Sequence, residues 1–152
     1  MRQRAVRPEE AGPRVSFLTM PGKPATARHA GVPPQAALAP KRLWALDGTP
    51  APGSPVSDLG ELTAAATAAV RAGDGNVLDT SHVVFPNGAV TLVLILAESH
   101  LAIHTWPEED FVAVDLFTCG AIDSERVLAE LVTSLRLTDT RVQQVRRGAA
   151  HS

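Results

Sequence analysis

The sequence predicts an α+β fold, a two-layer sandwich in which two helices pack on one face of a mainly antiparallel sheet. Three observations predict it. Two stretches repeat apolar residues at helical spacing, several shorter stretches are apolar or alternate as strands do, and compact turns join these shorter stretches. The 152 residues, of which 45% are hydrophobic and 20% charged, are ordinary for one globular domain.

The two helices are bounded by capping residues. The first is expected to begin at Ser57 or Asp58 and to end at Gly73, because short polar side chains cap helix starts and glycine commonly follows helix ends. Its apolar face consists of Leu59, Leu62, Ala66, Ala69 and Val70. The second is expected to begin at Asp123 or Ser124. Its apolar stripe consists of Val127, Leu128, Leu131, Val132 and Leu135.

The strands are expected at residues 43–46, 77–85, 90–97, 101–106, 111–118 and 141–145. The first is short, so we expect it at an edge of the sheet, followed by a turn at Asp47 and Gly48. A turn at residues 86–88 joins the second and third strands, and a polar loop at residues 107–110 joins the fourth and fifth. These short connections make the sheet mainly antiparallel.

The chain is expected to begin with a flexible tail over residues 1–40, ahead of a domain over residues 41–148. Most of the 12 prolines precede residue 56, and basic residues outnumber acidic ones in the first 42. Such a segment buries too little apolar area to offset its ordering entropy. A transit peptide, a basic arm that folds against the acidic body, and a start codon assigned too early are the alternatives.

Charge and cysteine content exclude several classes of function. A formal net charge of -2 argues against nucleic acid and anionic membranes as partners. A single cysteine rules out an intramolecular disulfide and a cysteine-rich metal site within one chain. A low cysteine content is also typical of proteins in the reducing cytoplasm. The longest apolar run is far shorter than the roughly 20 residues that a spanning helix needs. We therefore expect a cytoplasmic protein that is not embedded in a membrane.

Reactive side chains gather in two stretches of the otherwise apolar sheet. The first reads ESHLAIHTWPE over residues 98–108, and the second reads DLFTCG over residues 115–120. Serine, histidine and cysteine together suggest a nucleophile, a proton shuttle and a proton donor. Each also has a purely structural explanation, as a turn residue, a hydrogen-bonded core histidine and a small buried apolar residue.

These two stretches resemble the prokaryotic S-adenosylmethionine decarboxylases. The resemblance is dense from Glu98 to Gly120 and looser from about Lys41 to the last strand, and residues 1–40 lie outside it. It implies a self-processing, pyruvoyl-dependent decarboxylase that releases CO2 from the small molecule S-adenosylmethionine, in the biosynthesis of polyamines such as spermidine. It also implies that the processed chains assemble as a homodimer or larger oligomer, with pocket residues from both protomers.

The resemblance implies that Ser99 becomes the pyruvoyl cofactor. The Ser99 hydroxyl would attack the Glu98 carbonyl to form an ester, and β-elimination followed by hydrolysis would leave a ketone at a new N-terminus. The chain would then be split between Glu98 and Ser99 into a β chain and a pyruvoyl-bearing α chain. The ketone forms a Schiff base with the substrate amine and does the work of a pyridoxal ring, so no metal is expected.

Further roles follow from the same resemblance. His104 is expected to move protons during processing, and Cys119 to reprotonate the substrate α-carbon. Glu108 is expected to bind ribose hydroxyls and Phe85 to stack on adenine. Thr91 is expected to belong to the substrate-binding residues, because it keeps a hydroxyl that the family has at this position. Direct roles for His100 and Asp115, which lie on the same strands, stay open. Trp106 is interpreted as a packing residue more than as a ligand contact.

Two departures from the family pattern leave the substrate open. Residues 88–92 read GAVTL where the family commonly has Gly-Val-Ser/Thr-Gly-Val, and residues 42–47 read RLWALD where His-Leu-x-x-Asp is typical. A paralogue that decarboxylates ornithine or arginine is therefore an alternative, as is a non-catalytic homologue. A zinc site would instead use the donors Glu98, His100, His104, Glu108 and Cys119.

Overall fold

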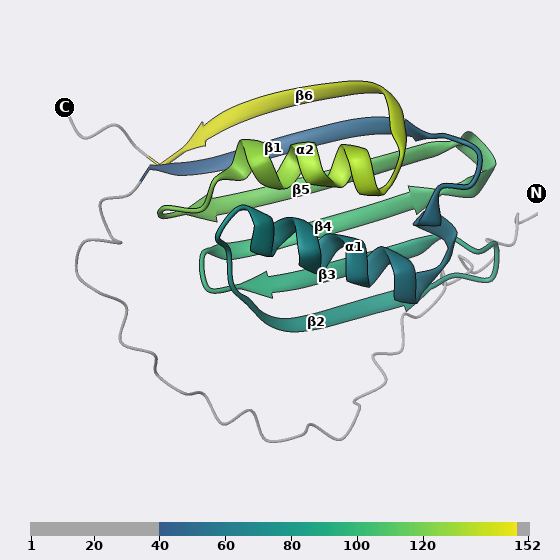
Figure 1. Ribbon diagram of the computed structural model, residues 1–152, viewed down its shortest axis with the longest axis horizontal. Helices are drawn as coiled ribbons and strands as arrows, with labels where there is room; N and C mark the ends of the chain where they lie inside the picture. Colours follow the sequence, from purple (N-terminus) through teal and green to yellow (C-terminus); the bar gives the residue numbers. More distant parts are fainter. Residues whose placement is uncertain (1–39, 149–152) are drawn as a thin grey trace, which may run out of the picture. The chain divides into compact units, whose positions relative to one another are not determined.

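The computed structural model describes residues 40–148 (Figure 1). The flexible tail expected for residues 1–40 falls almost wholly outside the described residues. The described chain forms one six-stranded sheet with two helices lying over the same face. The predicted α+β class and two-layer architecture are confirmed.

The sheet is antiparallel throughout, in the order β2-β3-β4-β5-β1-β6. Its strands are β1 (Lys41–Pro50), β2 (Val77–Val84), β3 (Val90–Leu96), β4 (Ser99–Trp106), β5 (Phe111–Cys119) and β6 (Leu137–Arg147). The helices are α1 (Leu59–Ala72) and α2 (Ser124–Ser134), and two short 3-10 turns are η2 (Pro55–Ser57) and η3 (Pro107–Glu109).

Both helices begin at predicted caps. The Asp58 carboxylate accepts a hydrogen bond from the Glu61 amide at 2.8 Å, and the Asp123 carboxylate accepts one from the Arg126 amide at 3.0 Å. Gly73 ends α1 as predicted. A Cβ atom on Gly73 would lie 2.6 Å from the Asp123 carbonyl oxygen, so only glycine lets the end of α1 approach the start of α2 so closely.

The core lies between the helices and one face of the sheet. Alternate residues of the strands point into it, as expected when successive side chains point to opposite faces. The fully buried members on β3, β4 and β5 include Leu92, Leu94, Leu101, Ile103 and Leu116. The residues between them, such as His104 on β4 and Phe117 on β5, lie on the opposite face. No helix of residues 40–148 covers this face, which we call the open face.

Two local predictions were wrong. Residues 43–46 do not form a short edge strand, because β1 is longer and lies between β5 and β6, which leaves β2 and β6 at the edges. Asp47 and Gly48 do not form a turn either. They lie inside β1, where the pairing with β6 shifts register between Asp47 and Thr49, as at a β-bulge. A Cβ atom on Gly48 would be 3.1 Å from the Leu137 Cβ, so the glycine suits this close crossing.

Candidate active site

Ser99 lies at a strained turn between two adjacent inner strands, β3 and β4. Residues 97 and 98 form the turn that joins β3 to β4, and Ser99 begins β4 with φ 140°. Residues other than glycine rarely adopt a positive φ, and holding one there costs about 1–3 kcal/mol. The chain is continuous here, so the distances below describe the uncleaved form. The peptide bond before Ser99 is thus a stressed point of the fold.

The carbonyl of that peptide bond is held by Cys119, the last residue of β5. The Glu98 carbonyl oxygen accepts a hydrogen bond from the Cys119 amide at 2.9 Å and another from the Cys119 thiol at 3.3 Å. The Ser99 Oγ lies 3.9 Å from the Cys119 Sγ. Donors aimed at a carbonyl oxygen stabilise the negative charge that forms there when a nucleophile attacks. The structure therefore brings Glu98, Ser99 and Cys119 together.

Asn76, which the sequence analysis did not single out, holds the other side of the turn. The Glu98 carboxylate accepts hydrogen bonds from the Asn76 backbone amide and from its side-chain amide, both at 3.1 Å. The Ala97 amide donates to the Asn76 carbonyl oxygen at 2.9 Å. No local sequence signal marks Asn76, because it precedes Glu98 by 22 residues and meets it only through the pairing of β2 with β3.

A second group of predicted residues gathers at the other end of β4, on the open face. They line a hollow of about 230 Å³. Within it the Thr91 Oγ1 lies 3.0 Å from the His104 Nδ1, and the Asn87 side-chain amide donates to the Glu108 carboxylate at 3.0 Å. The lining residues with polar or aromatic side chains are Phe85, Asn87, Thr91, His104, Thr105, Trp106 and Glu108. Asn87 was missed as a site residue because its sequence context marks it only as a turn residue.

The two groups are far apart within one chain. His104 follows Ser99 by five residues on the same strand, and at about 3.3 Å per residue this separates them by about 16 Å. The Ser99 hydroxyl and the His104 imidazole therefore do not meet in one chain. The seven residues predicted for the site form two half-sites, one at each end of β4. We call them the serine half-site (Glu98, Ser99 and Cys119) and the histidine half-site (Phe85, Thr91, His104 and Glu108, which line the hollow).

The aromatic neighbours of these residues pack on the open face. The His100 ring stacks on Phe117 with ring centres 5.7 Å apart, and Trp106 lies between His104 at 6.0 Å and Phe111 at 5.4 Å. In residues 40–148, no three histidine, cysteine or acidic side chains gather as metal ligands would. The five donors of the zinc alternative therefore do not form a cluster.

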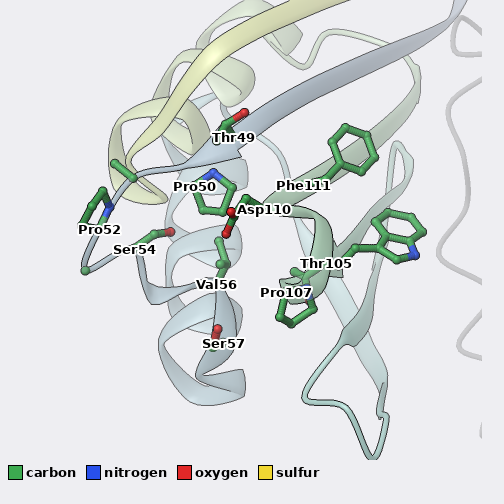
Figure 2. A pocket seen from close by; sticks show the side chains of 13 residues that line it. Thr49, Pro50, Pro52, Ser54, Val56, Ser57, Thr105, Pro107, Asp110 and Phe111 are labelled. Carbon is green, nitrogen blue, oxygen red and sulfur yellow. The ribbon is translucent and has the colours of Figure 1, made fainter.

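A larger hollow of about 380 Å³ lies next to the histidine half-site and shares Thr105 and Trp106 with it. Figure 2 shows that prolines and the side chains of Ser54, Val56 and Ser57 surround it. Asp110 is the one ionisable residue in its lining, which contains no predicted site residue. This hollow is therefore separate from the residues predicted for self-cleavage and substrate binding. None of the helices within residues 40–148 is long and apolar enough to cross a membrane.

The fold and the held serine turn define a class, an α+β chain that presents a serine hydroxyl beside a hydrogen-bonded carbonyl at a strained turn. Residues 42–148 match the family model described as S-adenosylmethionine decarboxylase. The chain is 43% identical over 98 residues to the S-adenosylmethionine decarboxylase proenzyme of Acidithiobacillus ferrooxidans, an alignment that covers 63% of this chain and 73% of that protein. It is 40% identical over 82 residues to the proenzyme of the same name from Thermotoga petrophila, covering 53% of this chain and 62% of that protein.

The crystal structure of the adenosylmethionine decarboxylase from Aquifex aeolicus has the same fold. The TM-score is 0.66 at 24% identity, over 74% of this chain and 94% of that chain. The chain belongs to the S-adenosylmethionine decarboxylase family. Members of this family are pyruvoyl-dependent decarboxylases made as proenzymes, and the pyruvoyl group is derived from an internal serine by self-cleavage.

Proposed function

We propose that this chain is the proenzyme of a pyruvoyl-dependent decarboxylase that cleaves itself between Glu98 and Ser99 and then converts S-adenosylmethionine to its decarboxylated form and CO2, for polyamine biosynthesis. The observation that carries this proposal is the strained Ser99 next to a carbonyl held by two donors of Cys119. The names of the relatives favour S-adenosylmethionine over ornithine or arginine.

The serine half-site supports the first step of self-cleavage, from which the later steps follow. The Ser99 Oγ attacks the Glu98 carbonyl carbon, and the oxygen that becomes negative is the one that the Cys119 amide and thiol already hold. The C–N bond then breaks, the Ser99 nitrogen takes a proton and an ester links the two residues. Loss of the Ser99 α-proton then expels the α-carboxylate of Glu98, which becomes the C-terminus of the β chain, and leaves dehydroalanine at residue 99. Water converts the dehydroalanine to ammonia and a ketone. Relief of the strain at Ser99 favours the first step.

The residues around this turn fit the group that results. When formed, it supplies the electrophilic carbonyl and electron sink that pyridoxal phosphate supplies in other decarboxylases. Cys119 is the proton donor in this proposal, because its Sγ lies 3.9 Å from the Ser99 Oγ, next to the reacting atoms. Its thiol delivers a proton to the substrate α-carbon after CO2 leaves.

The histidine half-site supports substrate binding. Asn87 holds the Glu108 carboxylate from one side, which leaves its remaining lone pairs to accept from ribose hydroxyls. Phe85 is 45% exposed at the rim, so its ring is free to stack on adenine. Thr91 holds the His104 ring by its hydroxyl, which fixes the orientation of the imidazole that moves protons during processing.

A second copy of the chain is needed to bring the two half-sites together, which supports a homodimer. The histidine hollow, at about 230 Å³, is smaller than the roughly 300–1,000 Å³ typical of small-molecule pockets. A two-fold axis between two open faces that crosses the strands reverses the strand direction. When the axis crosses β4 near its midpoint, it sets the His104 end of β4 in one copy against the Ser99 end of β4 in the other. The apolar and aromatic side chains of the open face, including the 46% exposed Ile95, suit such an interface.

We further propose that residues 41–148 form the enzyme domain and that it acts in the cytoplasm. In this proposal Cys119 acts as a free thiol. A reducing compartment such as the cytoplasm keeps thiols in that form. Residues 1–39 lie outside the described part of the chain.

Release of CO2 from labelled substrates tests the proposed function. We expect CO2 from S-adenosylmethionine and none above background from ornithine or arginine, without added pyridoxal phosphate and unchanged by a chelator. Ser99→Ala is the control and should give none. Preference for ornithine or arginine would overturn the substrate assignment. Activity that a chelator removes and zinc restores would overturn the pyruvoyl chemistry.

Cys119→Ala is expected to separate processing from turnover. The variant keeps the Cys119 backbone amide that holds the Glu98 carbonyl, so it should still cleave itself. It loses the proton donor, so turnover per processed chain should fall roughly 100-fold or more. Gel analysis measures cleavage, and CO2 release measures turnover. Wild-type turnover in a fully processed Cys119→Ala protein would remove the thiol from the mechanism.

A further inference from the structure

We propose that Asn76 is a positioning residue for self-cleavage, which holds the turn before Ser99 in the geometry that lets the hydroxyl reach the Glu98 carbonyl. The proposal rests on the proposed function, in which Glu98 and Ser99 are the cleavage site. Asn76 touches neither reacting atom, so it acts through Glu98 and Ala97.

The contacts of Asn76 define two sides of the turn. Its backbone and side-chain amides both donate to the Glu98 carboxylate, each at 3.1 Å, and its carbonyl oxygen accepts from the Ala97 amide at 2.9 Å. Cys119 holds the Glu98 carbonyl from the neighbouring strand on the other side. Asn76 and Cys119 together fix both residues of the turn, Ala97 and Glu98. The Glu98 carbonyl directly precedes Ser99, whose φ is 140°.

The loop that carries Asn76 is itself fixed to the fold. A Cβ atom on Gly75 would lie 2.5 Å from the Ile122 Cδ1 and 2.8 Å from the Val70 Cγ1, so this buried glycine packs directly on α1 and on the segment that follows β5. The Asp123 amide donates to the Gly73 carbonyl oxygen at 2.9 Å. The same segment, from Cys119 to Asp123, thus supports both holders of the turn.

The exposure of Asn76 indicates a role in rate more than in stability. Asn76 is exposed and the Glu98 carboxylate is half-buried, so water can replace the side-chain hydrogen bond with little loss of folding free energy. The attack of a hydroxyl on a neighbouring carbonyl depends far more steeply on geometry, because small misplacements of reacting atoms cost large factors in rate. Asn76 is therefore expected to affect the cleavage rate before it affects folding.

The test measures the cleavage rate of full chains made in a cell-free system, with synthesis stopped and the cleaved fraction followed on denaturing gels. Asn76→Ala should cleave roughly tenfold more slowly than wild type, and Asn76→Asp more slowly still, because its carboxylate meets that of Glu98. The double variant Asn76→Asp with Glu98→Gln restores a donor opposite a carboxylate. It should recover a rate within about threefold of wild type in a double-mutant cycle.

The matched control is Asp74→Asn. It changes the charge of the same loop by one and keeps a residue type that tolerates the φ of 60° at that position. It should cleave at the wild-type rate. Once fully processed, the Asn76 variants should release CO2 at the wild-type rate per α chain, which a general structural defect would not allow.

The outcomes separate the two proposals. If wild type does not cleave, the proposed function fails and this inference fails with it. If wild type cleaves and Asn76→Ala and Asn76→Asp match its rate, only this inference is overturned. A double variant that cleaves no faster than Asn76→Asp also overturns the positioning role of Asn76. The comparison of these two variants tests that role even if Asn76→Ala folds poorly.

Discussion

Ser99→Ala is expected to yield a single uncleaved chain with no decarboxylase activity, whereas wild type yields two chains. Alanine offers no nucleophile to the Glu98 carbonyl and cannot become a ketone, so both cleavage and turnover should fall to background. Mass spectrometry should find the full-length chain in the variant. In wild type it should find a β chain that ends at Glu98 and an α chain that begins with a pyruvoyl group. Folded wild type that stays uncleaved would contradict the cleavage site.

Ser99→Gly provides a matched comparison for the strain at this position. It also lacks the hydroxyl and should stay uncleaved, but glycine accepts the φ of 140° without penalty. The glycine precursor should therefore be more stable than the alanine precursor by about 1 kcal/mol in denaturant unfolding. Equal or lower stability of the glycine form would mean that Ser99 is not strained in the precursor.

His104→Ala is expected to block cleavage when expressed alone and to recover it when expressed together with Ser99→Ala. In a mixed dimer, the intact Ser99 of one chain faces the intact His104 of the other, and this restores one complete site. If subunits mix at random, roughly half of the His104→Ala chains should be cleaved. Chains of His104→Ala alone should accumulate as precursor or as a stalled ester that hydroxylamine releases.

The control for this experiment is a partner that carries both Ser99→Ala and His104→Ala. It forms the same mixed dimers and offers no histidine, so it should restore nothing. Two results would contradict the composite site. One is normal cleavage of His104→Ala alone, and the other is the lack of cleavage in mixed dimers whose presence is established by differently tagged chains.

Local features of the fold were predictable because short-range chemistry determines them. Asp58, Gly73 and Asp123 bound their helices for reasons contained within a few residues of each, and the alternation in residues 101–106 marks a half-buried strand wherever it pairs. The place of β1 was not predictable in this way. Strand order depends on pairing between distant segments, and β1 joins β5 and β6 from the far end of the domain.

The residues of the candidate site were proposed from the sequence, whereas their arrangement in space was not predictable from it. The resemblance to the decarboxylase family pointed to Ser99, His104 and Cys119, and the hollow gathers Thr91 and Glu108 with the histidine. The separation of Ser99 from His104 follows only once both are placed on one extended strand, where five residues span about 16 Å. Asn76 was missed because its partner lies across a strand pair.

The strand order has a consequence for the mature protein once the turn at Ser99 is cut. The β chain keeps β1, β2 and β3 and the α chain keeps β4, β5 and β6, yet β1 stays inserted between β5 and β6. The two polypeptides are thus interleaved, and three of the five strand pairings join one to the other. They stay together without a covalent link, but once denatured they must find each other as separate molecules. We therefore expect the proenzyme to fold more efficiently than the two separated chains, and the cleaved enzyme to depend on slow unfolding.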